Sequence, residues 1–201
     1  MSLRSFFTVP ERLREPIPVT AGAFVVLTLI GFVAGLVQPE LFKPLLDTFA
    51  VTVEERGLAE ASGAELMGGI LSNNLSALFI AMLLGLVPFL RLPAMELGLN
   101  ALLLGAMAAM YQRGGLSLLA FLAGTLPHGV TELSALVLAC AGGLHLCRTV
   151  NDALLQRGEP GAVGRAMGDC MLLYARFIVP LLLVSAFIEA FITPAILNAF
   201  L

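Results

Sequence analysis

The sequence predicts an all-α protein: a polytopic helical membrane bundle of about five full spans plus a half-helix that a proline breaks. Composition is the first observation behind this prediction. Of the 201 residues, 59% are hydrophobic and 12% are charged, whereas soluble domains have about 25% charged residues. One soluble core of this size cannot hide so much apolar surface, so lipid is the expected partner of the excess. The second observation is that apolar residues gather in runs of about 20, the helical length that crosses a bilayer core.

The beginning of the chain predicts a charged segment followed by the first span. Residues 1–17 contain five charged side chains and no small-residue cleavage site follows them cleanly, so we expect a cytoplasmic segment rather than a signal peptide. Residues 18–38 carry no charge and reach the spanning length. Pro39 ends this helix, and the spacing of Gly31 and Gly35 favours close approach of a neighbouring helix.

Two polar stretches predict connectors within a single helical membrane domain over residues 18–201. Residues 40–70 hold six acidic side chains against Lys43 and Arg56. Their pattern favours an amphipathic helix that lies at the membrane surface or packs on the bundle. Residues 148–171 form a polar stretch with several glycines. We expect the first to be an outer connector and the second an inner connector.

The remaining spans follow from apolar runs and their breaks. The stretch 116–147 is too long for one upright span at about 1.5 Å per residue, and Pro127 lies near its middle. Because proline removes a helical hydrogen bond, we expect a half-helix over 116–126 that breaks before a full helix begins at residue 128. Asn73 and Asn74 are capping residue types and are expected to open the second span. The predicted full spans after the first are residues 71–90, 94–111, 128–147 and 172–192.

Basic residues predict the orientation, because cytoplasmic loops carry an excess of Lys and Arg. With a cytoplasmic N-terminus, eight basic residues lie inside and three lie outside. With an even number of full spans, the basic residues would no longer gather on one side of the membrane. The sequence therefore predicts a multi-pass protein of the cell membrane. The inner residues are Arg4, Arg12, Arg14, Arg91, Arg148, Arg157, Arg165 and Arg176, and the outer residues are Lys43, Arg56 and Arg113.

Three ionisable residues in the apolar segments are candidates for one site. His128 and Glu132 are four residues apart, so a helix places both on one face. Imidazole nitrogen and carboxylate oxygen are ligands of a divalent metal such as zinc, and Glu189 would supply a third. Ionisable groups in hydrocarbon cost about 2.5–3.5 kcal/mol on insertion scales. Two other interpretations stay open: a hydrogen-bond network without metal, and a path for a proton or solute.

Four further polar side chains are candidates for an intramembrane network. Asn73, Asn74 or Asn100 could supply oxygen atoms to the same site. Glu96 lies in the first turn after Pro93, where the helix dipole favours a carboxylate, so an interfacial position is expected. Asn100, one turn further along, is the better candidate for a hydrogen bond between helices.

Composition and motifs argue against nucleic-acid binding and catalysis. The formal net charge is −3 without a long basic run, whereas nucleic-acid binding needs a basic face. No nucleophile motif, His-Glu-x-x-His pattern or phosphate-binding glycine loop occurs, so we expect no enzyme activity. The cysteines have an odd count and no zinc-finger spacing, which favours simple packing in apolar surroundings. They are Cys140, Cys147 and Cys170.

Four stretches of the chain resemble the stage II sporulation protein M family of bacterial and archaeal membrane proteins. The similarity covers roughly residues 20–197, and its stretches occur in the family's order. The resemblance implies a helical membrane protein of five or six segments, and it implies that the histidine and the two glutamates belong to one site. The stretches are Ser72-Asn-Asn-Leu-Ser76, Asn100 with Gly105, Pro127-His-Gly-Val-Thr-Glu-Leu-Ser-Ala135, and Ile188-Glu-Ala-Phe-Ile-Thr-Pro194.

The resemblance implies a non-enzymatic scaffold or anchor, since the family's named member works with peptidoglycan-degrading partners during engulfment of the forespore. The acidic outer connector is consistent with recruitment of such envelope proteins. Two alternatives stay open. A transporter or channel for an ion or small solute is favoured by the broken helix with intramembrane carboxylates, and the cluster favours a metal-binding membrane protein. Small residues along the helices are compatible with a homo-oligomer such as a homodimer.

Overall fold

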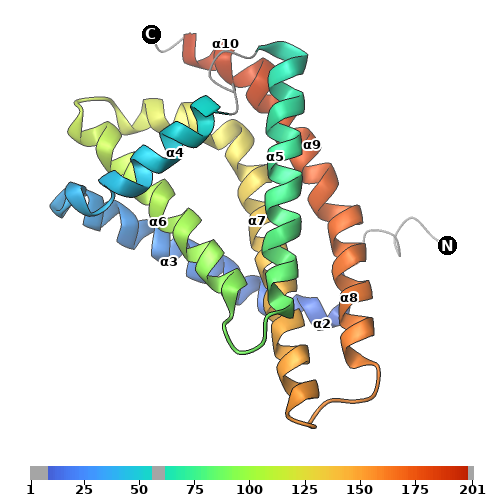
Figure 1. The fold of residues 1–201 in the computed structure, drawn as a ribbon. Coiled ribbons are helices and arrows are strands. Elements are labelled where there is room, and N and C mark those ends of the chain that lie inside the picture. Colours follow the sequence, from blue (N-terminus) through green and yellow to red (C-terminus); the bar gives the residue numbers. More distant parts are fainter. Residues whose placement is uncertain (1–8, 56–61, 199–201) are drawn as a thin grey trace.

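The computed structural model describes residues 9–55 and 62–198, and these residues form helices joined by short turns (Figure 1). Two of the short segments, η3 and η4, are π-helical. In chain order the elements are α2 (Glu11–Arg14), α3 (Pro16–Val37), η1 (Pro39–Leu41), α4 (Lys43–Glu55), α5 (Gly63–Leu83), η2 (Leu84–Leu86), α6 (Leu92–Arg113), α7 (Leu118–Leu154), α8 (Ala162–Leu173), η3 (Tyr174–Ile178), α9 (Val179–Phe187), η4 (Ile188–Ile192) and α10 (Thr193–Asn198).

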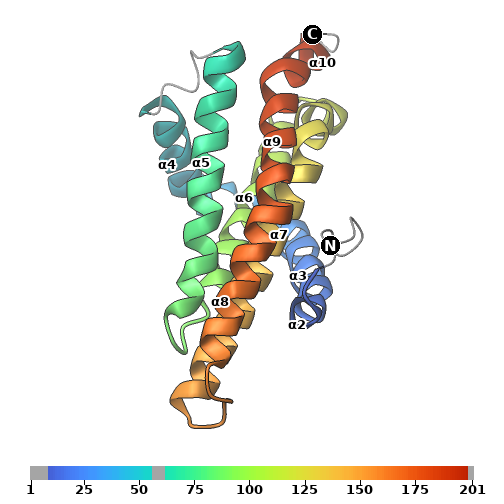
Figure 2. The same cartoon turned by 90° about the vertical axis from the view of Figure 1, so that its right-hand side faces the viewer.

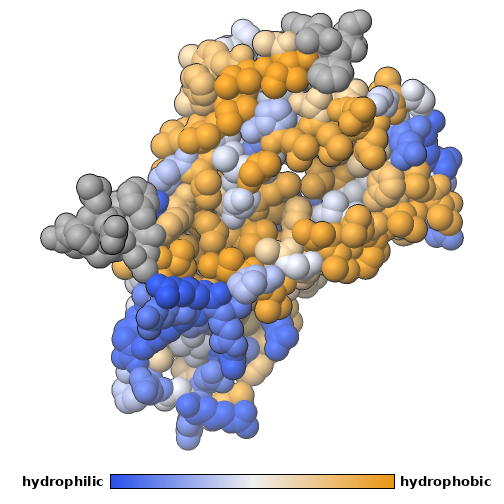
Figure 3. Space-filling view, turned by 180° about the vertical axis from the view of Figure 1, so that it is seen from behind, coloured by the Kyte–Doolittle hydropathy of each residue, from blue (hydrophilic) through white to orange (hydrophobic). Residues whose placement is uncertain are grey.

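Five helical stretches are long and apolar enough to cross a membrane, which confirms the predicted fold class. Figure 3 shows hydrophobic side chains over most of one face, with hydrophilic ones gathered at its lower end and at its right-hand edge. Exposed apolar residues such as Val25 and Val33 suit a lipid environment, because lipid removes the cost of exposing them to water. The stretches are Glu11–Val37, Gly63–Leu86, Leu92–Arg113, Leu118–Leu154 and Ala162–Ile196.

The predicted break at Pro127 is wrong, because α7 is helical from Leu118 to Leu154 with the proline inside it. The separate half-helix over 116–126 therefore does not exist. Figure 1 shows what happens instead: the first turns of α7 run across the view before the helix turns downward. Proline costs one helical hydrogen bond and bends a helix, but neighbouring helices can support the bend without ending the helix.

Both connectors are shorter than predicted, because the helices continue past the apolar runs. The first connector, 40–70, contains α4, and α5 already begins at Gly63. Most of the second connector, 148–171, is also helical, so that only residues 155–161 join α7 to α8. Hydropathy marks where a helix leaves lipid, whereas the helix itself ends only where its hydrogen bonding stops.

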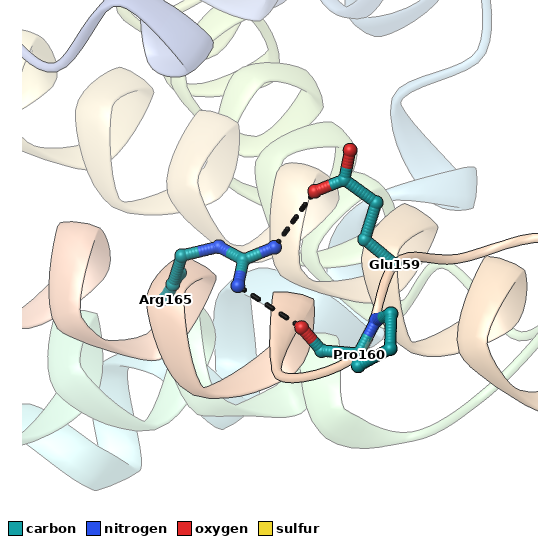
Figure 4. Close-up of polar contacts among 3 residues, drawn as sticks. All are labelled: Glu159, Pro160 and Arg165. Atoms are coloured by element: carbon teal, nitrogen blue, oxygen red, sulfur yellow. Dashed lines mark hydrogen bonds and ion pairs between the residues drawn. The ribbon is translucent and has the colours of Figure 1, made fainter.

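The α7–α8 turn is held by one arginine (Figure 4). The Arg165 guanidinium donates to the Glu159 carboxylate over 2.9 Å and to the Pro160 carbonyl oxygen over 3.0 Å. Gly161 immediately precedes α8 and has a φ of 73°, a left-handed conformation that glycine adopts without steric cost. The turn extends beyond the neighbouring helices at the lower end of the bundle (Figures 1 and 2).

Glycines let α3 and α6 pack closely. A Cβ atom at Gly31 would overlap the carbonyl oxygen of Leu102, and one at Gly105 would overlap the carbonyl oxygen of Thr28. Gly35 lies against Ala106 and Ala109 in the same way. The close approach predicted from the Gly31–Gly35 spacing is therefore confirmed, and α6 is the partner helix.

Helix α7 contacts most other elements and forms the centre of the bundle. The last span packs along it as a helical rod made of α8, η3, α9 and η4 (Figure 2), and α10 continues this rod but bends across the top of the view in Figure 1. Leu146 of α7 and Leu173, Ile178 and Leu182 of the rod belong to one buried core cluster. This packing fixes the two helices against each other and positions the polar residues near their upper ends.

Candidate functional site

Three ionisable side chains from two helices meet inside the bundle. His128 and Glu132 lie one turn apart on α7, and Glu189 comes from the π-helical segment η4 of the last span. One ligand atom from each residue lies within 4.8 Å of the other two. All three side chains are half-buried. The structure thus brings together the three residues that the sequence singled out.

The π-helical segment η4 spans Ile188–Ile192 and contains Glu189 in its first turn. A π-helical turn accommodates an extra residue, so it changes which side chains face a neighbouring helix, and such turns recur at functional sites. Segment η4 contacts both α7 and α5. We attribute the position of Glu189 beside the α7 pair to this local geometry.

Two hydroxyl residues of the last span contact His128. Ser185 precedes Glu189 in the sequence, and Thr193 follows it. The His128 ring Nδ1 lies 3.2 Å from the Thr193 hydroxyl oxygen. The Ser185 hydroxyl donates to the His128 backbone carbonyl oxygen over 3.2 Å. Thr131 donates to the same carbonyl oxygen over 2.8 Å. Both Ser185 and Thr193 are buried, so these contacts lie inside the packed interface between the two helices.

Glu132 is also tied to α5. The Asn74 side-chain amide donates to Glu132 Oε1 over 3.1 Å, and the Asn73 amide donates to Asn74 Oδ1 over 3.2 Å. The prediction that these asparagines open a helix is wrong, because both lie in the middle of α5. An interior asparagine in an apolar helix needs a partner for its amide, and here the carboxyl group of α7 supplies it.

Glu96 and Asn100 do not join this cluster. Asn100 donates to the Glu96 backbone carbonyl oxygen over 2.9 Å and to its carboxylate over 3.1 Å. Both contacts stay within α6, and Asn100 is exposed on the surface of that helix. The predicted interhelical role of Asn100 is therefore wrong. The four polar residues named from the sequence divide into an asparagine pair at the cluster and a separate pair on α6.

The two glutamates of the cluster have no basic partner in the part of the chain that the structure describes. The ion pair found there, Arg165 with Glu159, lies in the α7–α8 turn at the lower end of the bundle. Among residues 9–55 and 62–198, the cluster therefore combines two carboxyl groups and one imidazole without an ion pair to Lys or Arg. Such a group of ligands can hold a cation, or it can share protons in a hydrogen-bond network.

Sequence reasoning missed Ser185 and did not assign Thr193 to the site. Thr193 follows Glu189 by four residues, so helical spacing was an available signal for it. Ser185 precedes Glu189 by four residues, and the same spacing applies. The buried Ser185 hydroxyl is 0% exposed, which prevents it from meeting a substrate as a nucleophile.

The other chemistry-bearing residues lie away from the cluster. The three cysteines are free thiols and are buried, in agreement with the packing role expected for them. His145 lies near the lower end of α7, beside a cavity that Arg12 and Arg165 also line. Its Nε2 is buried and has no hydrogen-bond partner in the described residues.

These features define an all-helical, multi-pass membrane protein with a histidine and two glutamates gathered between two of its spans. The family model for stage II sporulation protein M matches residues 20–194, and the chain belongs to this family. An uncharacterised protein of Methanocaldococcus jannaschii is 31% identical over 127 residues, which cover 63% of this chain and 70% of that protein. No solved structure matches the chain.

Proposed function

We propose that this protein is a non-enzymatic membrane scaffold that recruits cell-envelope proteins, specifically proteins that remodel peptidoglycan. Family membership over residues 20–194 is the observation that carries this proposal. The fold is consistent with it, because five apolar stretches are long enough to anchor the chain in lipid. The polar α7–α8 turn lies at one end of the bundle, and exposed Lys43 and Asp47 lie on α4 towards the other (Figure 1). Docking on those polar ends would hold a partner at the membrane surface.

The proposed orientation places the N-terminus in the cytoplasm. The α5–α6 turn, which contains Arg91, and the α7–α8 turn, which contains Arg157, lie at the same end of the bundle (Figure 1). The excess of basic residues in such loops marks the cytoplasmic side. Helix α4 and the α6–α7 turn would then face the outside, where peptidoglycan lies.

Helix α4 is the proposed outer docking element. It lies at the upper left of Figure 1 and runs obliquely to α5 instead of parallel to it. Lys43, Pro44, Asp47 and Thr48 of this helix are exposed, and so is Leu41 just before it. An amphipathic helix of this kind can rest at the membrane surface while it offers polar side chains to a partner.

The structure supports a transporter or channel less well than the sequence does. That alternative rested on a helix broken at Pro127 beside intramembrane carboxylates, and α7 is continuous through this residue. Discontinuous helices supply the ion sites of many transporters, and this feature is absent from α7. We therefore propose the scaffold as the function of this protein.

Site-specific photocrosslinking in intact cells tests the scaffold. A photoreactive amino acid is placed at Asp47 on α4 or at Leu116 in the α6–α7 turn, and Val25 on the apolar surface of α3 serves as the matched control. All three positions are exposed. The expected result is an adduct with a peptidoglycan-remodelling protein from an outer position and none from Val25. Adducts with this chain alone, or none above the Val25 level, would contradict the proposal.

A further inference from the structure

We propose that His128, Glu132 and Glu189 bind one divalent transition-metal ion, with zinc as the best chemical fit, and that this ion clamps α7 to the last span. The proposal goes beyond the scaffold function and does not depend on it. It rests on the distances within the cluster, on its ligand chemistry and on the hydrogen bonds that surround it.

The distances within the cluster suit one ion. Zinc binds nitrogen and oxygen ligands at about 2.0–2.2 Å, so the ligands of a tetrahedral ion lie about 3.4 Å apart. The three ligand atoms here already lie within 4.8 Å of one another. Side-chain rotations that move each atom by about an ångström would bring the three atoms to coordination distance, while α7 and η4 keep their backbones in place. The fourth tetrahedral position would be taken by a water molecule.

The ligand chemistry favours a divalent transition metal over a harder ion. One imidazole and two carboxylates form a nitrogen and oxygen set of the kind that binds zinc, whereas magnesium and calcium prefer oxygen alone. When both carboxyl groups are ionised, they carry two negative charges, which one divalent ion neutralises.

The surrounding hydrogen bonds leave lone pairs of both α7 residues for an ion. If His128 Nδ1 carries the proton and donates to Thr193 Oγ1, Nε2 keeps its lone pair for the metal. Glu132 accepts from Asn74 at Oε1 and also lies within hydrogen-bonding reach of the Ser185 hydroxyl, and a carboxylate has further lone pairs that can coordinate an ion. Outer partners of this type orient metal ligands and fix the histidine tautomer in known metal sites.

The ion would join elements that are distant in sequence. His128 and Glu132 belong to the upper half of α7, and Glu189 lies 57 residues further along in η4. Thr193, at the start of α10, is attached to the same cluster through His128. Binding should therefore stabilise the folded chain, and its local effect should be largest on the π-helical segment and the helix that follows it.

Metal analysis of the purified protein tests this inference. The full chain is purified in mild detergent from zinc-supplied cells, and its zinc content is measured before and after EDTA treatment. We expect about one zinc ion per chain, loss of this zinc in EDTA, and a rise in Tm when zinc is returned, because an ion that binds only the folded state stabilises it. A chain without zinc whose Tm zinc does not raise would overturn the proposal.

Matched variants locate the ion. Glu132→Gln and Glu189→Gln keep side-chain size and remove one ligand charge, so each should lose bound zinc. Glu96→Gln alters a glutamate of another span outside the cluster and should keep it. Asn74→Ala removes the outer partner of Glu132 and should weaken zinc affinity about 10–100-fold. Retention of stoichiometric zinc by both cluster variants would place the ion elsewhere and overturn the proposal.

Hydrogen exchange of the unaltered chain provides a test that needs no variant. Residues 188–196 should exchange more slowly with zinc than with EDTA, while α3 should exchange equally in both conditions. Equal exchange of 188–196 in the two conditions would contradict the clamp. Crosslinking of an envelope partner from α4 is a separate measurement, so failure of the metal proposal and failure of the scaffold proposal give different results.

Discussion

Asn74 on α5 donates a hydrogen bond to Glu132 on α7 over 3.1 Å, across 58 positions of sequence. Asn73 extends this contact by donating to Asn74. The cluster of His128, Glu132 and Glu189 is therefore joined to a third span as well as to the two that supply it. An uncompensated amide or carboxyl group inside an apolar bundle is costly, so this bond should contribute to the stability of the fold.

Removing the Asn74 amide should destabilise the bundle. We expect Asn74→Ala to lower the free energy of unfolding by about 1 kcal/mol, the usual size of a hydrogen bond between membrane helices. Asn100→Ala is the control, because Asn100 is exposed and bonds only within α6. Equilibrium unfolding in detergent, with EDTA present to exclude metal, measures both. An equal loss in the two variants would refute the structural role of Asn74.

The contact between α3 and α6 should be sensitive to a single methyl group. A Cβ at Gly105 would overlap the Thr28 carbonyl oxygen, whereas a Cβ at Gly22 meets no atom within 4 Å. We expect Gly105→Ala to cost about 1–3 kcal/mol by forcing the helices apart. Gly22→Ala should leave the free energy of unfolding unchanged or raise it slightly. Thermal unfolding of the two variants measures this difference in stability. Similar Tm values would contradict the prediction, because they would show that α3 and α6 can move apart without a loss of stability.

The bond between Thr193 and His128 should also be measurable. Thr193→Val keeps the shape of the side chain and removes the hydroxyl that lies 3.2 Å from His128 Nδ1. We expect a loss of about 1 kcal/mol. Thr28→Val is the matched control, because the Thr28 hydroxyl bonds only to the Phe24 carbonyl oxygen of its own helix. Equilibrium unfolding in EDTA gives the free energy of unfolding of both variants. A loss of stability in Thr28→Val but not in Thr193→Val would contradict the predicted role of the Thr193 hydroxyl.

The proposed orientation predicts which side of the membrane each turn faces. The three native cysteines are buried, so a thiol reagent should report mainly on a cysteine introduced at an exposed site. Leu116→Cys in the α6–α7 turn should react with a membrane-impermeant reagent in intact cells. Arg157→Cys in the α7–α8 turn should react only after the membrane is permeabilised. The reverse pattern would place the N-terminus outside and invert the topology.

The sequence by itself determined the fold class and the number of spans. Long uncharged runs such as residues 18–38 must lie in lipid as helices, because only a helix satisfies its backbone within one segment there. The spacing of Gly31 and Gly35 also predicted a close helix contact, since a missing side chain leaves room for a neighbouring backbone. These inferences need only local composition and the period of the helix.

Only the tertiary structure decided how Pro127 is accommodated and where the polar residues go. A proline disfavours a straight helix, but neighbouring helices determine whether it bends or ends, and α7 continues. Asn74 and Asn100 have the same side chain in similar apolar runs, yet Asn74 reaches Glu132 while Asn100 stays on its own helix. Rotation of each helix against its neighbours decides such pairings, and the sequence of one helix does not contain that rotation.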